Sequence, residues 1–162
     1  MLAIVDQSPA VQPANNRHGH APWRSDPDHF PRRGQSSQIG RDFERHGGVA
    51  SAEDVALLMR RHCEQPVSQL ARWIVGSKIV HFVDQSQTWV PLFQFDLDDM
   101  SIRPAVIALL GELGTVMDSD ELAAWFVTCN EWLSDEAPID MMEADFPAVL
   151  DAARADRFVT RG

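Results

Sequence analysis

Four histidines in the first 46 residues are the side chains whose spacing most suggests metal chemistry. His18 and His20 form an H-x-H pair, and His29 and His46 follow. Stable transition-metal sites combine such ligands with cysteines or carboxylates on a rigid backbone. No cysteine accompanies these histidines, and the surrounding sequence is crowded with Pro, Gly, Asn and Ser. We therefore expect a solvated polar tail here and no metal site.

Neither the cysteines nor the acidic clusters form a clear reactive group. Cys63 and Cys129 have no CxxC or ligand spacing, so reduced thiols are expected. The acidic turn at residues 96–101, DLDDMS, lacks the central glycine and terminal glutamate of a calcium loop, and electrostatics at a helix start explain it better. No nucleophile–base pair or phosphate-binding glycine loop is visible. We expect no catalytic residue, no cofactor and no enzymatic activity.

The composition indicates a globular protein of one domain or two very small ones, with 162 residues of which 44% are hydrophobic and 23% charged. The apolar runs fall far short of the roughly 20 residues of a membrane span, and no basic segment with an apolar core opens the chain. A cytoplasmic protein without membrane contact is therefore expected. The net charge is −10, divided as +1 up to His46 and −11 after it. Such an acidic body repels phosphate backbones and favours a protein partner over DNA.

Three segments are expected along the chain, and the fold class is mainly α. Residues 1–46 are predicted to be a disordered or extended tail, because no apolar residue recurs there at a helical or strand period. Residues 47–95 are predicted to form a small helix-turn-helix with a β-hairpin wing. Residues 96–162 are predicted to form a C-terminal helical bundle domain.

In the front unit, Ser51 is expected to cap a first helix, with Asp54 three residues on. The apolar face of that helix would consist of Val55, Leu58 and Met59. The hairpin is predicted from two apolar runs at residues 79–83 and 88–90, which flank a polar turn and end at a proline.

The second helix of this unit should start at Pro66 and end near Gly76. Four apolar residues at helical spacing form its expected inward face: Val67, Leu70, Ala71 and Ile74. The residues then left outward are the candidate DNA contacts: Ser68, Gln69, Arg72, Trp73 and, just beyond the helix, Lys78. One arginine on a helix is little for groove binding, so a scaffolding or dimer role is the stronger expectation.

The remainder is predicted as helices. Pro104 opens one with an apolar stripe of Val106, Ile107, Leu110, Leu113 and Met117, and Asp118 with Glu121 caps a second that carries Leu122, Trp125, Phe126 and Cys129. Pro138 starts a short helical turn, and Asp145 caps a last helix. Trp125 and Phe126 are expected in the core. Trp132 lies in a polar turn and is either a core residue or a binding anchor.

The C-terminal segment ARADRFVTRG places cations and an aromatic residue on an otherwise acidic body. Arg154, Arg157 and Arg161 surround Phe158. These cations either complement the negative end of the last helix or form part of a binding surface, and both interpretations stay open.

From about Gly47 onward the chain resembles proteins in which an excisionase- or MerR-like winged-helix unit precedes the toxin-binding domain of the Xre/MbcA/ParS antitoxin family. The matching segments are GGVASAEDVALLM, FQFD, RPAVIALLGEL, ELAAWFVTCNEWL and APIDMMEADFPAVLDAARA. The turn SDEA replaces the glycines that relatives usually carry before a P-L/I-D step, and the second front helix lacks their several cations.

The resemblance implies an antitoxin-like protein that occludes a RES-type, NAD-destroying toxin, with self-regulation as an added role. In the family the terminal region approaches the toxin's active site, which carries over here to Arg154, Arg157, Phe158 and Arg161. Trp132 joins them as a candidate partner contact. The alternative is a DNA-binding transcriptional regulator that uses residues 67–75 and the hairpin. A homodimer is compatible with either function.

Overall fold

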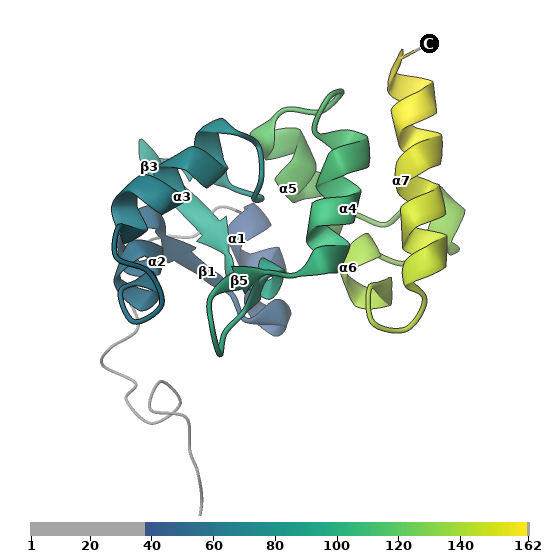
Figure 1. Ribbon diagram of the computed structural model, residues 1–162. Coiled ribbons are helices and arrows are strands. Elements are labelled where there is room, and N and C mark those ends of the chain that lie inside the picture. The colour runs from purple at the N-terminus through teal and green to yellow at the C-terminus, as the bar shows by residue number, and fades with distance from the viewer. Residues whose placement is uncertain (1–37, 162) are drawn as a thin grey trace, which may run out of the picture. The chain divides into compact units, whose positions relative to one another are not determined.

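The computed structural model describes residues 38–161, and this part of the chain is mostly helical with a small antiparallel sheet (Figure 1). The expectation of a mainly helical fold is confirmed at that level. None of the helices within residues 38–161 is both long and apolar enough to cross a membrane. The expectations for His18, His20 and His29 concern residues outside the described range.

The segment expected to be a tail as far as residue 46 has regular structure from Gln38 onward, so that prediction is wrong for its last part. Helix α1, Gln38–Asp42, is followed by the 3-10 helix η1, Glu44–His46. Phe43 between them is fully buried and stacks on Phe93 with ring centroids 5.6 Å apart. A single buried aromatic residue produces no periodicity, which is why the pattern of the sequence does not show it.

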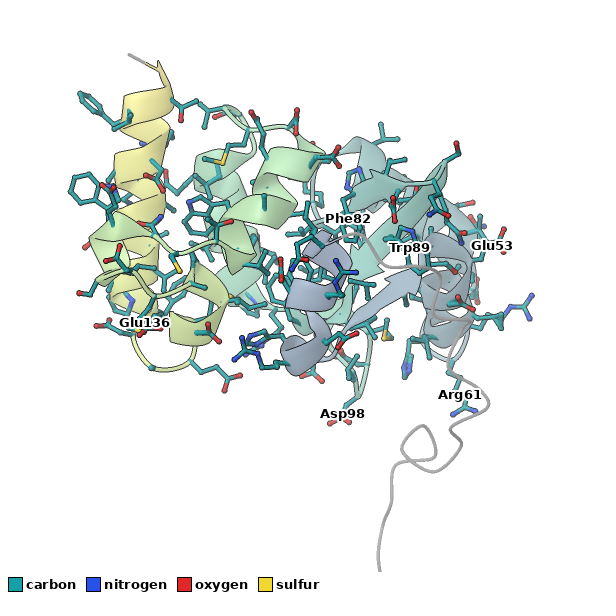
Figure 2. The ribbon with its side chains drawn as sticks, turned by 180° about the vertical axis from the view of Figure 1, so that it is seen from behind. Glu53, Arg61, Phe82, Trp89, Asp98 and Glu136 are labelled. Atoms are coloured by element: carbon teal, nitrogen blue, oxygen red, sulfur yellow. The ribbon has the colours of Figure 1, made fainter. Side chains whose placement is uncertain are left out.

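Three strands form the larger sheet in the order β1-β3-β2: β1 Val49–Ser51, β2 Phe82–Asp84 and β3 Gln87–Pro91. The predicted hairpin corresponds to β2 and β3, and Phe82 pairs with Trp89 across it (Figure 2). Its turn residues Gln85 and Ser86 both have positive φ, 50° and 63°, as tight hairpins require. Strand β1 was not predicted, because three residues are too few to show an alternating pattern.

Helix α2, Ala52–Met59, begins as expected, since the Ser51 hydroxyl accepts a hydrogen bond from the Asp54 amide at 3.1 Å. Val55 and Met59 are buried on its inner face. Leu58, expected beside them, is 41% exposed. The small Ala56 is buried there instead.

Helix α3, Pro66–Val75, has the expected bounds but is rotated about its axis relative to the expected face. Leu70 is buried and Trp73 packs against the core, where it stacks on Phe95 at 6.1 Å. Val67 and Ala71 are exposed. The prediction of Val67 and Ala71 inward and Trp73 outward is therefore wrong. In the observed orientation the large indole of Trp73 packs against the smaller core and stacks on Phe95, which stabilises the rotated helix.

Gln94 joins the segment just before β2 to the end of β3. It ends the 3-10 helix η2, Leu92–Gln94, ahead of a two-stranded sheet of β4, Phe95–Asp96, and β5, Ser101–Ile102. The Gln94 side chain is fully buried and makes three hydrogen bonds. It accepts from the Val80 amide at 2.6 Å and donates to the carbonyls of Val80 at 2.8 Å and Pro91 at 2.7 Å.

The C-terminal half of the described chain consists of four α-helices and one 3-10 helix. The α-helices are α4 (Pro104–Leu113), α5 (Ser119–Val127), α6 (Pro138–Met141) and α7 (Phe146–Arg161), and the 3-10 helix η3 (Glu131–Leu133) lies between α5 and α6. The Asp118–Glu121 capping box at α5 is present as predicted. Trp125 and Phe126 are buried, which confirms their core role. Ile107 and Cys129, expected on inner faces, are exposed.

The larger of two hydrophobic cores takes residues from both sides of the domain boundary expected after residue 95. Phe43, Val80, Phe82 and Phe93 from the front pack in one cluster with the inner faces of α4, α5 and α7. A smaller cluster lies under α2 and α3 and includes Val55, Leu70, Ile79, Val90 and Phe95.

Candidate partner-binding surface

The last turns of α7 extend beyond α4 and α5 (Figure 1) and carry apolar side chains in solvent. Phe158 is 82% exposed and Val159 is 68% exposed. Large apolar residues at such exposure cost little when scattered, but neighbouring ones at a protruding helix end are typical of a binding surface. Arg161 is the last residue of α7, and its side chain lies outside the described part.

Arg154 and Arg157 do not point freely into solvent, because both engage Glu112 on α4. Arg154 Nε lies 3.1 Å from Glu112 Oε1, and Arg157 Nη1 lies 2.5 Å from Glu112 Oε2. Arg154 also contacts Asp151 at 3.1 Å. Glu112, and then Asp151, raise the pKa of the Arg154 guanidinium above its ordinary value. The two pairs with Glu112 join α7 to α4 and fix the direction in which the end of α7 projects.

Trp132 lies on a short element that packs against α7. It lies in η3, which packs against α7, and its side chain is 62% exposed. Asn130 caps η3, because its Oδ1 accepts from the Trp132 amide at 2.9 Å. Asp156 of α7 in turn accepts from Asn130 Nδ2 at 2.8 Å and from the buried indole of Trp125 at 2.7 Å. Trp132 is therefore not a core residue, and its role as a binding anchor stays a prediction.

The turn after η3 has the geometry that glycine adopts most easily. Ser134 and Asp135 have φ of 57° and 65°, in the left-handed region. Both residues belong to the segment SDEA that was singled out in the sequence. The loop geometry is thus formed without glycine, at a conformational cost of roughly 1 kcal/mol per residue.

A groove lies beside α5 and the end of α7, with a volume of about 360 Å³. Its lining residues include Met117, Ala124, Trp125, Thr128, Cys129 and Thr160. Thr160 and Phe158 are two positions apart on α7, so the groove and the Phe158 ring lie on different sides of the end of that helix. We name Trp132, Phe158, Val159 and this groove the α7-end surface.

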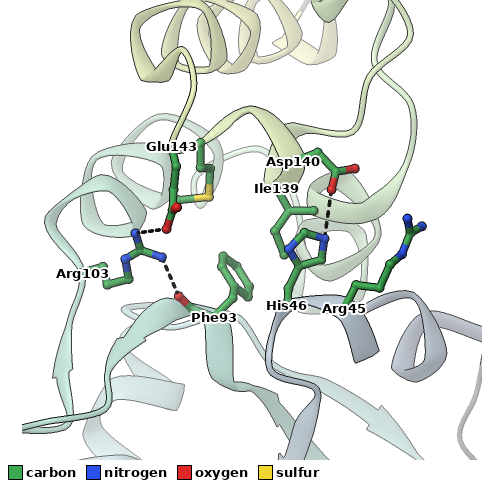
Figure 3. A pocket seen from close by; sticks show the side chains of 8 residues that line it. Arg45, His46, Phe93, Arg103, Ile139, Asp140 and Glu143 are labelled. Atoms are coloured by element: carbon green, nitrogen blue, oxygen red, sulfur yellow. Dashed lines mark hydrogen bonds and ion pairs between the residues drawn. The ribbon is translucent and has the colours of Figure 1, made fainter.

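A second cavity, of about 360 Å³, is polar and lies where η1, Phe93 and α6 meet (Figure 3). His46 Nε2 lies 3.1 Å from Asp140 Oδ1, and Arg103 Nη2 lies 3.0 Å from Glu143 Oε1. Its lining includes no serine, threonine or cysteine that could act as a nucleophile. Within residues 38–161 no three metal-ligating side chains come together. The charges around this cavity neutralise one another and specify no ligand.

Because α3 is rotated relative to the expected face, the candidate DNA contacts do not all lie on its exposed side. Ser68, Arg72 and Lys78 are exposed, Gln69 is partly buried, and Trp73 turns toward the core. Arg72 Nη2 donates to Gln69 Oε1 at 2.9 Å. Outward positions of α3 are taken by Val67, Ala71 and Val75, so the exposed face is largely aliphatic.

The carboxylates of the acidic turn at residues 96–101 accept hydrogen bonds from the backbone of the same turn. Asp96 Oδ1 accepts from the Asp98 amide at 3.0 Å and Asp99 Oδ1 from the Ser101 amide at 2.8 Å. Hydrogen bonds from the Ser101 side chain and backbone lower the pKa of Asp99. Asp98 points away from the body at the tip of the turn (Figure 2). The helix-start explanation was therefore incomplete, because two carboxylates cap this turn and α4 begins only at Pro104.

No family model matches the chain, and neither a curated protein nor a solved structure matches it.

The residues that organise the surface, Glu112 and Asp156, were not singled out from the sequence. Their partners lie 26 to 45 residues away along the chain, and no local pattern links residues at that separation. The roles of Glu112 and Asp156 are therefore visible only in the folded chain.

Proposed function

We propose that this chain is a non-enzymatic, antitoxin-like protein whose α7-end surface binds a protein partner and covers the partner's functional pocket. The observation that carries the proposal is the exposure of Trp132 and Phe158, at 62% and 82%, on elements held in place by Asp156 and Glu112. Aromatic side chains on a rigid support bind with little loss of conformational freedom, which is the property of interface hot spots.

The partner is a RES-type toxin, as the resemblance to the Xre/MbcA/ParS family implies. Its recognition rests on apolar contact more than on charge, because Arg154 and Arg157 are already paired with Glu112. The two arginines act by orienting the end of α7. Occlusion is steric, since the α7-end surface would fill the entrance of the partner's active site.

The test is co-expression of the full chain with the protein encoded beside its gene. Wild-type protein should restore growth, whereas Phe158→Asp and Trp132→Asp should each weaken neutralisation by about tenfold or more, because a charge enters an apolar contact. Leu57→Asp is the matched control: Leu57 is 57% exposed on α2, outside the surface. If the neighbouring protein is not toxic, or stays toxic beside the wild-type chain, the proposal fails.

The alternative is a DNA-binding regulator, supported by the order of α2, α3 and the β2–β3 hairpin, which suits a winged-helix unit. Arg72 and Lys78 would be its phosphate contacts. Its test is a mobility shift on the chain's own promoter at rising salt, compared between wild type and Arg72→Ala. Binding that weakens steeply with salt and disappears in the variant supports it, and no binding at low salt excludes it.

A further inference from the structure

The outward face of α3 is an aliphatic ridge on an acidic protein. Val67, Ala71 and Val75 follow one another at four-residue spacing and all three are exposed, with Val67 at 70% and Val75 at 86%. Residues four apart lie above one another on a helix, so the three side chains form one continuous line. Arg72 is the one charged residue of α3. Two copies of this acidic protein would therefore repel each other weakly if they approached through this ridge.

We infer that this ridge is a homodimer interface, in which α3 packs antiparallel against α3 of a second copy about a two-fold axis at Ala71. In this arrangement Val67 lies opposite Val75 of the other copy, and Ala71 lies opposite itself. The small alanine at the crossing point lets the two helices approach closely, while the valines interlock on either side. The interface is separate from the α7-end surface and does not depend on the proposed function.

Charge complementarity at the ends of α3 selects a second copy as the occupant. Glu64 precedes the helix by two residues, Lys78 follows it by three, and both are exposed. An antiparallel pairing about Ala71 places the start of α3, next to Glu64, beside the end of α3 of the other copy, next to Lys78, so that one salt bridge can form at each end of the interface. Within residues 38–161 neither side chain has an ion-pair partner of its own. A parallel pairing would instead bring like charges together.

The proposed dimer has a consequence for the alternative function, because it covers the helix that would enter a DNA groove. Ser68 and Arg72 flank the ridge and would lie at the edge of the interface. A chain that dimerises in this way cannot use the same face of α3 on DNA.

The first experiment measures the molecular mass of the full chain by sedimentation equilibrium over a wide range of concentrations. Wild type should shift from monomer to dimer as concentration rises. Ala71→Arg places two guanidinium groups on the axis and should abolish the dimer, and arginine remains a strong helix former at an exposed position. Leu57→Arg on α2 is the control and should dimerise as wild type does. A wild type that stays monomeric throughout, or a dimer that survives Ala71→Arg, overturns the inference.

The second experiment tests the antiparallel register. Glu64→Lys and Lys78→Glu should each weaken the dimer about three- to thirtyfold, because both salt bridges become repulsive contacts. The double variant exchanges the charges and should return to within about twofold of wild type. Circular dichroism checks that all variants are folded. A double variant no stronger than the single ones rules out this register.

Discussion

Gln94 shows how one polar side chain organises two parts of the backbone. Its amide satisfies both the N–H and the C=O of Val80 and also the C=O of Pro91, all inside the protein. Buried polar groups without partners lose the hydrogen bonds they had with water, so a residue that satisfies three of them at once has a large effect on stability. The segment FQFD was singled out from the sequence by resemblance, but the role of its glutamine comes from the structure.

Replacing Gln94 should be strongly destabilising. Gln94→Met keeps nearly the same volume but leaves three backbone groups unsatisfied, so the free energy of unfolding should fall by about 3 kcal/mol or more. Urea denaturation followed by tryptophan fluorescence measures it. Gln87→Met, at an exposed position of β3, is the control and should stay within about 0.5 kcal/mol. Equal effects from the two variants would contradict this role for Gln94.

Ser134 offers the opposite case, a residue whose replacement should stabilise. Its φ of 57° is strained for a residue with a Cβ atom, so Ser134→Gly should raise the free energy of unfolding by about 0.5 to 1 kcal/mol, after the entropic cost of glycine is included. Thermal unfolding with calorimetry measures this difference. Ser134→Ala keeps the Cβ atom and should bring no gain. A destabilised glycine variant would mean that the serine hydroxyl matters more than backbone strain.

At the scale of elements, α7 is positioned by pairs that connect distant parts of the chain. Glu112 on α4 holds Arg154 and Arg157, while Asp156 holds Trp125 and Asn130. Helix α7 is thus fixed to α4 through one set of residues and to α5 and η3 through another. Its last turn, beyond these contacts, carries Phe158 and Val159.

Glu112→Gln should loosen α7 without unfolding the protein. Loss of the two ion pairs should lower the free energy of unfolding by about 1 kcal/mol at low salt, and by less at high salt because screening already weakens the pairs. Amide exchange at the end of α7 should become faster. Glu143→Gln removes the pair with Arg103 at an 80% exposed carboxylate and should change stability much less. A salt-independent loss at Glu112 would point to packing instead of charge.

The elements also show what sequence patterns can and cannot supply. Ser51, the Asp118–Glu121 box and the prolines at positions 66, 104 and 138 marked helix starts correctly, because caps act within one helical turn. The rotation of α3 was not predictable from its own apolar spacing. Both faces of that helix are apolar, and the choice depends on Phe95, which is 22 positions further along the chain and receives the Trp73 ring.

At the scale of the whole described chain, Phe43 joins its beginning to its helical half. The ring stacks on Phe93, which itself contacts Phe126 of α5 with centroids 5.0 Å apart. Three aromatic rings from three separate segments therefore form one row inside the larger core. Nothing near Phe43 in the sequence indicates this, because its partners lie far along the chain.

Phe43→Ala should destabilise the helical half as well as the start of the chain. A cavity of this size in a packed core costs about 3 to 5 kcal/mol, and unfolding should stay a single transition because the cluster is shared. Phe158→Ala, at an 82% exposed ring, is the matched control and should stay within about 0.5 kcal/mol. Two separate transitions for the wild type would show that the halves on either side of residue 95 unfold independently.

The projecting end of α7 also bears on how this protein should be handled. A purification tag or fluorescent protein joined after Gly162 would begin five positions after Phe158, and its bulk would obstruct the end of α7. An affinity measured on such a fusion would report the tag's obstruction together with the interaction. Attachment at Met1 leaves that end of the helix open, and comparing the two versions is itself a simple assay of whether the end of α7 takes part in the proposed binding.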